Sequence, residues 1–207
     1  MVSYVTKIND NAFQYRYSLT SVVIPDSVTS IGAGAFKGCN IKDATIPAIA
    51  CSYIKGSSLR TLVITSGDTI AKSALSNCTN LTSVVIGDSV TSIERMAFYG
   101  CTNLISLTIG NSVKTIGDYA FYGCSSLTSV VIPDYVTLID EYAFYNCTSL
   151  TSVVIPDSVV TIDRYAFAYS SNLTIYCEVE SKPNNWDSNW NYSNCTVVWG
   201  YKPAVTA

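Results

Sequence analysis

The sequence predicts an α/β solenoid, a stack of coils with short strands on one face and short helices or helical turns on the other. Three observations predict it. A segment that begins with leucine starts at positions 81, 104, 127, 150 and 173, so its spacing along the chain is constant. Hydrophobic residues make up 48% of the chain and charged residues only 13%, a composition that requires a large buried core. Within each copy the apolar residues alternate first and then change spacing.

The five clearest copies cover most of the chain. They read LTSVVIPDSVTSIGAGAFKGC from Leu19, LTSVVIGDSVTSIERMAFYGC from Leu81, LISLTIGNSVKTIGDYAFYGC from Leu104, LTSVVIPDYVTLIDEYAFYNC from Leu127 and LTSVVIPDSVVTIDRYAFAYS from Leu150. Two degenerate copies begin at Ile41 and Leu59, and a partial copy opens the chain between Val2 and Phe13. Because one coil cannot bury its apolar side alone, we expect about eight stacked coils over residues 1–172 and an atypical C-terminal capping segment over residues 173–207, within one structural domain.

The first element of each coil is a short strand. In the copy from Leu81, the spacing of Leu81, Val84 and Ile86 is the one in which a strand directs alternate side chains into a core. Ser83 and Val85 then face outward. A Gly-Asp or Pro-Asp pair follows the strand, and these residue types are typical of turns.

The rest of the coil supplies two more inward groups. Val90 and Ile93 form a second apolar pair after the turn. The segment ERMAFYGC then places Ala97, Phe98 and Cys101 at the spacing of a single helical turn, and the glycine before the cysteine suits a helix exit. Between Ile41 and Leu59 the chain has lost its SVTSIG segment, so we expect the curvature to be distorted locally.

These LTSVVIPDSVTSIG and AFYGC units resemble the leucine-rich repeats, and most closely the BspA-type repeats of bacterial and protozoan surface proteins. The resemblance covers about 170 of the 207 positions. It implies a leucine-rich-repeat solenoid, although the chain lacks the asparagine that commonly follows the strand. It also implies an adhesion or protein-interaction module whose partners are host proteins or other cell-surface proteins, with glycans as a second class of ligand.

Composition argues against several other functions. The net charge is −3, and the 12 Lys and Arg residues are scattered, so neither nucleic acid nor an anionic membrane is the expected partner. There is no histidine, which removes the commonest general base and the Ser-His and Cys-His pairs of nucleophilic catalysis. We therefore predict a protein that is not an enzyme and has no catalytic residues and no cofactor. Nothing in the sequence indicates an oligomeric state.

The location of the protein is predicted from its start and from the resemblance. No apolar run reaches the roughly 18 to 20 residues of a membrane span, and MVSYVTKIND lacks the charged start and apolar core of a signal peptide. Such a start fits either an intracellular protein or a mature fragment. The resemblance implies the second, which is an extracellular or cell-surface protein whose signal peptide was removed or lies upstream.

Five of the eight cysteines share one position of the repeat. They are Cys39, Cys78, Cys101, Cys124 and Cys147. Equivalent side chains of stacked coils run parallel instead of toward each other, which disfavours disulfides between them. Metal binding would require clustered Cys or His, and cysteines that occur once in each repeat do not provide clusters. We therefore interpret these residues as a buried structural thiol ladder and predict no metal site.

Cys177 and Cys195 differ from the ladder because they lie beyond the last full coil. They flank a segment that contains Trp186 and Trp190, two of the three tryptophans. A disulfide between them would staple the end of the solenoid, as secreted proteins often do, or both thiols could stay reduced. The large aromatic side chains are expected to cover the last coil, and a carbohydrate platform is the alternative interpretation.

Two outer surfaces are candidate binding surfaces. On the helical side, one row of tyrosines is Tyr99, Tyr122 and Tyr145, and a second row is Tyr119, Tyr142 and Tyr165. Tyrosine rows suit protein or sugar binding, although each ring could simply cover the neighbouring coil. The strand face presents a nearly uncharged set of small side chains, namely Ser83, Val85, Ser106, Thr108, Ser129, Val131, Ser152 and Val154.

These observations predict a non-enzymatic adhesion or protein-interaction module, displayed by a bacterium or protist or secreted, that binds through a repetitive surface. The missing catalytic groups and the repeat architecture support this interpretation. The alternative is a carbohydrate-recognition or scaffold domain attached to a larger secreted enzyme. The alternative predicts a catalytic domain encoded beside this one.

Overall fold

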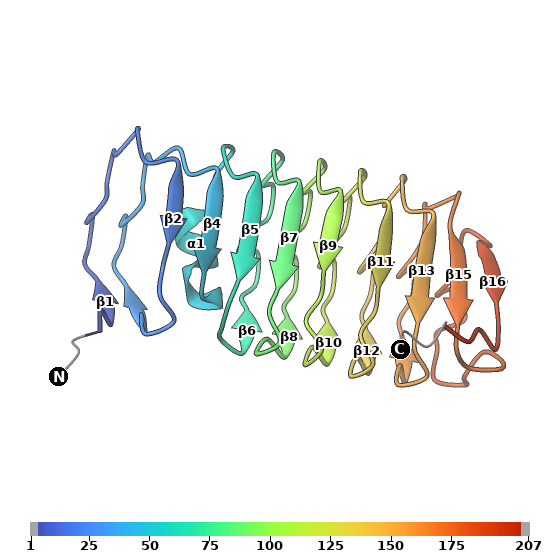
Figure 1. The fold of residues 1–207 in the computed structure, drawn as a ribbon. Helices are drawn as coiled ribbons and strands as arrows, with labels where there is room; N and C mark the ends of the chain where they lie inside the picture. Colours follow the sequence, from blue (N-terminus) through green and yellow to red (C-terminus); the bar gives the residue numbers. More distant parts are fainter. Residues whose placement is uncertain (1–3, 204–207) are drawn as a thin grey trace.

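The computed structural model describes residues 4–203 and shows the parallel-strand solenoid that the repeats predict (Figure 1). The coils stack in one row along a single axis, and each coil lies in register with the next. Residues 1–3, where the partial first copy and the predicted solenoid begin, and residues 204–207, where the predicted capping segment ends, lie outside the described part of the chain.

The first side of the stack is the strand face. Its strands are β2 (Ser21–Val23), β4 (Asp43–Ile46), β5 (Thr61–Ile64), β7 (Ser83–Ile86), β9 (Ser106–Thr108), β11 (Ser129–Val131), β13 (Ser152–Ile155), β15 (Thr174–Cys177) and β16 (Thr196–Val198). All the pairings are parallel, and equivalent repeat positions lie opposite one another, as Val84 and Leu107 do. The strands β15 and β16 continue the sheet past residue 173, so the domain boundary expected there stays a prediction.

The strand face consists of two sheets. One contains β2, β4, β5, β7 and β9, and the other contains β11, β13, β15 and β16. In the described part of the chain, no strand pairing joins β9 to β11. A gap of about 300 Å³ opens there, and its walls include Leu107, Ile109, Val131 and Pro133. The sequence does not predict this interruption, because the repeat continues across it with unchanged spacing.

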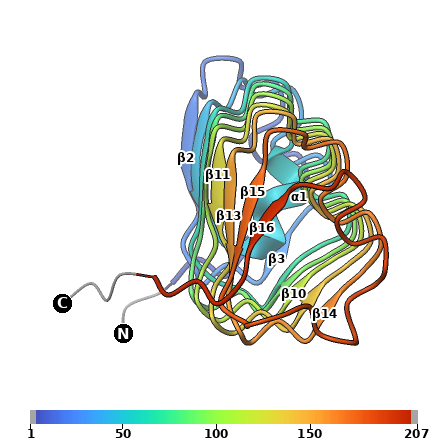
Figure 2. The same ribbon diagram turned by 90° about the vertical axis from the view of Figure 1, so that its right-hand side faces the viewer.

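The second side carries strands of only two residues. They are β1 (Lys7–Ile8), β3 (Ser30–Ile31), β6 (Thr69–Ile70), β8 (Ser92–Ile93), β10 (Thr115–Ile116), β12 (Leu138–Ile139) and β14 (Thr161–Ile162). Viewed along the stack, β10 and β14 lie on a different side of the coil from β11 and β13 (Figure 2). The pairing stops between β3 and β6, where the chain has lost its SVTSIG segment. There a 3-10 helix η1 (Ala48–Ala50) and a helix α1 (Cys51–Ile54) replace the missing strand.

The third side was expected to carry short helices or helical turns, and in the regular coils it carries turns that do not form a helix. Tyr119 and Gly123 both have positive φ angles, of 56° and 70°, which a right-handed helix does not contain. The N–H groups of Tyr119, Phe121 and Gly123 donate to carbonyls of the following coil. In a helix these groups would bond within the segment. These turn segments therefore link one coil to the next, as the strands do.

The core is a continuous apolar column between the three sides. The predicted inward residues Leu81, Val84, Ile86, Val90 and Ile93 are all buried, so the strand pattern was predicted correctly. Phenylalanines of successive turn segments stack on one another in the core, and the chain of stacked rings is Phe98, Phe121, Phe144 and Phe167, with centroids 5.1, 5.2 and 5.5 Å apart.

The two ends of the column differ. At the C-terminal end Trp186 and Trp190 are buried, and the ring of Trp190 meets Phe167 edge-on at 6.3 Å. The indole N–H of Trp186 donates to the carbonyl of Val159 at 3.2 Å. These two rings cover the last coil, as expected, and leave almost no face exposed to a carbohydrate. At the N-terminal end Phe13 stacks on the next ring of the column but remains 41% exposed.

Candidate functional site

The six predicted tyrosines come together on the turn segments as one surface, which we call the tyrosine strip. Its first row is Tyr99, Tyr122 and Tyr145, with ring centroids 4.9 and 4.8 Å apart. Its second row is Tyr119, Tyr142 and Tyr165, with centroids 4.7 and 5.4 Å apart. All six side chains are half-buried. Each ring therefore covers its neighbour, and the strip still has an exposed edge.

The two rows also touch each other. The rings of Tyr119 and Tyr122 are 5.5 Å apart, and those of Tyr142 and Tyr145 are 5.4 Å apart and tilted by 59°. Burial raises the pKa of Tyr119, Tyr122 and Tyr145 above the ordinary tyrosine value. These hydroxyls therefore remain protonated at neutral pH and are available as hydrogen-bond donors along an aromatic surface.

The second row is held in a strained backbone conformation. Tyr119, Tyr142 and Tyr165 have φ angles of 56°, 56° and 59°, a region that costs a residue other than glycine about 1–2 kcal/mol. In the first coils Asn11 and Gly34 occupy the equivalent position, and both residue types adopt this conformation readily. The tyrosines therefore occupy positions where the backbone alone favours glycine or asparagine.

Two further tyrosines, neither of them predicted from the sequence, extend the strip. In the last coil, Ala168 takes the position of the first row and Tyr169 takes the next position, which is glycine or asparagine in the preceding coils. Tyr192 comes from the segment before β16. Tyr169 lies 4.9 Å from Tyr145, and Tyr192 lies 5.1 Å from Tyr165. The change from FYGC to FAYS was the signal that could have identified Tyr169.

The strand face places its eight predicted residues on four strands, β7, β9, β11 and β13. Val85 and Val131 are 39% and 67% exposed, whereas Ser83, Ser152 and Val154 are half-buried. The gap between β9 and β11 divides the eight residues into two groups of four. The strand face is therefore two short patches, and none of these eight side chains is ionisable.

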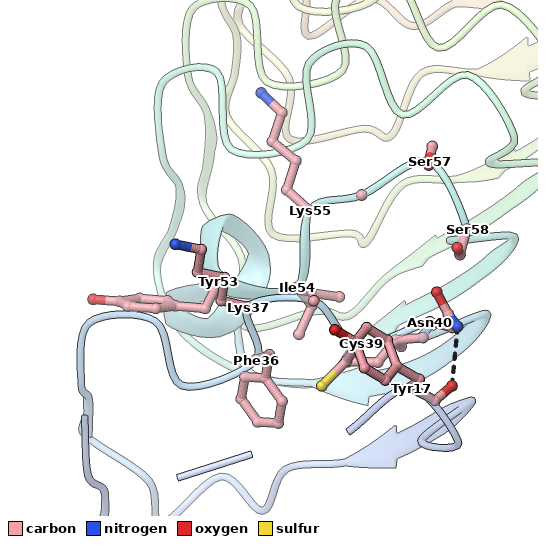
Figure 3. Close-up of a pocket in the computed structure, with 13 residues that line it drawn as sticks. Tyr17, Phe36, Lys37, Cys39, Asn40, Tyr53, Ile54, Lys55, Ser57 and Ser58 are labelled. Carbon is pink, nitrogen blue, oxygen red and sulfur yellow. Dashed lines mark hydrogen bonds between the residues drawn. The ribbon is translucent and has the colours of Figure 1, made fainter. Parts of the chain in front are cut away.

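A groove of about 450 Å³ lies where the shortened coil departs from the repeat (Figure 3). The lining includes Tyr17, Cys39 and Asn40 on one wall and Lys55 on the other. The amide of Asn40 donates to the carbonyl of Tyr17 at 3.0 Å. Lys55 points away from Cys39 and donates to the hydroxyl of Ser76 at 2.6 Å. The lysine is thus engaged with the following coil and does not activate the thiol.

The predicted thiol ladder lies inside the turn segments. Cys78, Cys101, Cys124 and Cys147 are fully buried, and Cys39, in the groove, is half-buried. The thiols of Cys101, Cys124 and Cys147 donate to carbonyls 26 residues earlier, at 3.3 to 3.4 Å. Burial raises the pKa of Cys101 and of Cys147 to about 12. Such thiols are poor nucleophiles, which favours a structural role.

Cys177 and Cys195, between which a disulfide was considered, are free thiols in the structure. The two residues belong to different sides of the coil. Cys177 lies on β15 opposite Ile155, as an inward residue of the strand face. The thiol of Cys195 donates to the carbonyl of Ser170 at 3.4 Å, so it continues the ladder on the turn side.

Other chemistry has little support in the described residues. Within residues 4–203, no three His, Cys, Asp or Glu side chains are placed to hold a metal ion. A group of carboxylates, which includes Asp118, Asp140 and Asp163, lies beside the tyrosine strip. Burial raises the pKa of Asp118 and of Asp163. None of the described helices is long and apolar enough to cross a membrane.

Comparison with known proteins identifies the repeat. The family model "BspA type Leucine rich repeat region" matches residues 6–68 and 48–174, in six copies. No protein in the search of curated proteins matches the chain.

Several solved structures share the fold. A leucine rich cell surface protein from Faecalibacterium prausnitzii A2-165 is 28% identical with a TM-score of 0.55, and the match covers 90% of this chain and 53% of that chain. A leucine-rich repeat protein from Bacteroides ovatus ATCC 8483 is 28% identical with a TM-score of 0.63, covering 84% and 47%. The T. pallidum leucine-rich repeat protein is 31% identical with a TM-score of 0.55, covering 56% and 57%. The chain spans about half the length of these structures.

Proposed function

The chain belongs to the BspA-type leucine-rich repeat family, and on that premise we propose that it is a non-enzymatic module that binds proteins at a bacterial cell surface. The ligands in this proposal are proteins of other cells or of a host, and the binding surface is the tyrosine strip. The proposal places the module outside the cell. One of the similar structures is a leucine rich cell surface protein, which supports that location.

The observation that carries the proposal is the continuity of the two tyrosine rows. Neighbouring rings lie 4.7 to 5.4 Å apart along the rows, so the strip is an unbroken aromatic surface. Tyrosine is enriched in protein interfaces because its ring buries a large area, loses little entropy and keeps a hydroxyl for hydrogen bonds. Stacked neighbours hold each ring in place before binding, which lowers the entropic cost of association.

The strip suits a protein ligand better than the strand face does. The strand face is divided by the gap at β9 and β11, and its eight predicted residues all have small side chains. Small side chains are seldom the residues that dominate binding energy. The strip, by contrast, repeats one large side chain on successive coils, so an extended ligand can engage several equivalent sites at once.

A panel of immobilised extracellular-matrix and cell-surface proteins, together with a glycan array, tests the proposal. We expect the purified protein to bind at least one protein ligand and the double variant Tyr99→Ser, Tyr122→Ser to lose most of that binding. The matched control is Ser106→Ala, Thr108→Ala on the strand face, which should bind normally. Circular dichroism of both variants checks that the fold is intact.

Two outcomes would contradict the proposal. If the strand-face variant loses binding and the tyrosine variant does not, the binding surface is the strand face. If folded protein binds glycans and no protein ligand, the module is a carbohydrate-recognition domain. The alternative function, a recognition or scaffold domain attached to a larger secreted enzyme, would then be favoured.

A further inference from the structure

The C-terminal end of the tyrosine strip differs from the rest, because there the rings surround a pocket. The pocket has a volume of about 210 Å³, and it is lined by five side chains only, Tyr142, Tyr145, Tyr165, Tyr169 and Tyr192. We propose that this all-tyrosine pocket, here called the tyrosine cage, binds a quaternary ammonium group. The inference does not depend on the protein ligand proposed above, although the cage shares three of its rings with the strip.

A departure from the repeat creates the cage. In the regular coils the residue after the phenylalanine is a tyrosine that stacks on the row, as Tyr122 stacks on Tyr145 with an angle of only 6°. In the last coil that residue is Ala168, which is fully buried and leaves space beside Tyr145. The tyrosine has moved to position 169, and its backbone N–H donates to the hydroxyl of Ser193 at 2.7 Å.

The rings of the cage face several directions. Tyr145 and Tyr169 are tilted by 48°, and Tyr165 and Tyr192 by 74°. Neighbouring rings in the regular rows are nearly parallel. Their interplanar angles are 14° or less along Tyr99, Tyr122 and Tyr145, and also for the pair Tyr119 and Tyr142. Tyr142 and Tyr165 remain stacked, at 29°, so the change of ring direction is largest at Tyr169 and Tyr192. Tyr169 and Tyr192, at the rim, are 54% and 52% exposed.

The chemistry of the lining favours a cation. The face of an aromatic ring carries negative potential, and a quaternary ammonium ion bound among several such faces is a recognised use of this interaction. A quaternary ammonium has no N–H to donate, so it requires no hydrogen-bond acceptor from the site. The pocket corresponds to about seven water volumes of roughly 30 Å³ each, enough for a trimethylammonium head.

The charged groups near the cage are of both signs. Arg164, the basic residue beside Tyr165, is paired with Glu141 at 2.8 Å. Burial is the main cause that raises the pKa of Asp163, and the negative charges of Asp140, Glu141 and Asp187 add to it. Arg164 also lies close to Tyr142 and Tyr165. Its pairing with Glu141 reduces the repulsion that its charge would exert on a bound cation.

The backbone of the cage keeps the conformation of the repeat. Tyr142, Tyr165 and Tyr169 have φ angles of 56°, 59° and 61°. Ser73 and Met96 have the same positive φ in coils outside the cage, so this conformation belongs to the repeat and is not specific to the cage. A neutral sugar is a weaker candidate, because the lining offers hydroxyls but no amide or carboxylate to fix the orientation of several sugar hydroxyls.

Titration with small probes tests the cage directly. We expect tetramethylammonium and choline to bind in the millimolar range, as measured by chemical-shift changes or tyrosine fluorescence. The neutral isostere of choline, 3,3-dimethylbutan-1-ol, should bind at least about tenfold more weakly, because it lacks the charge that interacts with the rings. Equal binding of both probes would show an ordinary apolar pocket and overturn the proposal.

Variants locate the site. Tyr169→Leu and Tyr192→Leu should each weaken choline binding by about tenfold, whereas Tyr169→Phe keeps the ring and should retain binding. Tyr99→Leu, at the other end of the strip, is the control and should bind choline normally. If folded wild-type protein binds neither cation at tens of millimolar concentration, or if Tyr99→Leu weakens binding as much as Tyr169→Leu, the tyrosine cage is not the site.

Larger probes distinguish the source of the ammonium group. Phosphocholine represents a head group of lipids or cell-wall polymers, and a trimethyl-lysine peptide represents a modified protein. Binding of either supports the cage, and preference for one identifies the source. A panel of neutral oligosaccharides is the opposing arm, because saturable sugar binding that choline does not displace would replace the proposal. Loss of protein binding in Tyr99→Ser, Tyr122→Ser with choline binding intact would separate this site from the proposed interaction surface.

Discussion

At the scale of single residues, the tyrosine strip combines backbone strain, which destabilises the fold, with ring stacking, which stabilises it. Tyr119 has positive φ, while Tyr122, three residues later in the same turn segment, does not. Both rings stack on neighbours in other coils. Stacking is worth about 0.5–1.5 kcal/mol for each pair, which is similar to the cost of the strained backbone. The two tyrosines should therefore contribute differently to stability although they look alike from outside.

Replacing each of these tyrosines with asparagine separates the two contributions. Asparagine tolerates positive φ, so Tyr119→Asn relieves strain as it removes stacking, and we expect the free energy of unfolding to change by less than about 1 kcal/mol. Tyr122→Asn removes stacking without relieving strain, and we expect a loss of about 1–3 kcal/mol. Urea denaturation measures both. Equal losses in the two variants would show that the positive φ of Tyr119 carries no cost.

The thiols give a second prediction at this scale. Seven of the eight cysteines are buried, and Cys39 alone is half-buried. We expect a thiol reagent at pH 8 to label Cys39 rapidly in native protein and the others only after denaturation, because burial and a raised pKa, about 12 for Cys51 and Cys147, suppress the reactive thiolate. Cys39→Ser should abolish the fast phase. Rapid labelling of several thiols in native protein would contradict the buried ladder.

At the scale of elements, the sequence predicts strands far better than turn segments. The alternation of Leu81, Val84 and Ile86 fixes which side chains enter the core, because only one register buries all three. The turn segment has the composition and spacing of a helical turn, and its true conformation depends on positive φ at Tyr119, a residue type that gives no local signal for it. Bonds to the next coil stabilise that conformation, and such bonds cannot be inferred from one copy.

In the candidate site, too, the regular residues were easier to predict from the sequence than the irregular ones. The six tyrosines of the strip could be predicted because their positions recur with the repeat. Tyr169 and Tyr192 could not be predicted in the same way, since one is displaced by a residue and the other comes from the irregular segment before β16. The groove and the break between β3 and β6 depend on how the chain crosses the shortened coil. Features that arise from departures from the repeat therefore required the structure.

The carboxylates beside the turn segments make stability depend on pH. Burial, with Asp140 as the next contributor, raises the pKa of Asp163, and burial also raises the pKa of Asp118. A carboxyl group whose pKa is higher in the folded than in the unfolded state binds its proton more tightly in the folded state. It therefore stabilises the fold below the unfolded-state pKa of about 3.9, and this stabilisation is lost as the pH rises through the folded-state pKa. Asp26 acts oppositely, because hydrogen bonds from Thr65 and Ser66 lower its pKa, so its contribution is lost at strongly acidic pH.

We therefore expect the melting temperature to rise as pH falls from 7 toward the unfolded aspartate pKa of about 3.9 and to fall again at more acidic pH. Asp163→Asn removes the charge that burial disfavours, so it should raise the melting temperature at pH 7 and change it little near pH 4. Asp157→Asn, on an exposed turn of the same coil, is the control. A melting temperature of Asp163→Asn that is lower than wild type at pH 7 would contradict this account.

At the scale of the whole molecule, the gap on the strand face divides an otherwise continuous stack. In a solenoid each coil contacts only its neighbours, so stability is close to a sum of coil and interface contributions. The interface between β9 and β11 has lost its strand pairing on one side. It keeps the pairing of Thr115 with Leu138 on the second side and the bonds of the turn segments on the third. This interface should be the weakest one within the regular coils.

Hydrogen exchange detected by mass spectrometry can locate that interface. The N–H of Ser106 donates to the carbonyl of Thr82 in the preceding coil, whereas no pairing in the described chain connects β11 back to β9. We expect peptides that span Ser129–Val131 to exchange faster than peptides from β7 or β13, because local opening there breaks fewer hydrogen bonds. The equivalent turn-segment peptides of the same coils serve as the internal control and should exchange at similar, slow rates. Uniform protection along the strand face would mean that the two sheets are joined in solution and that the stack unfolds as one unit.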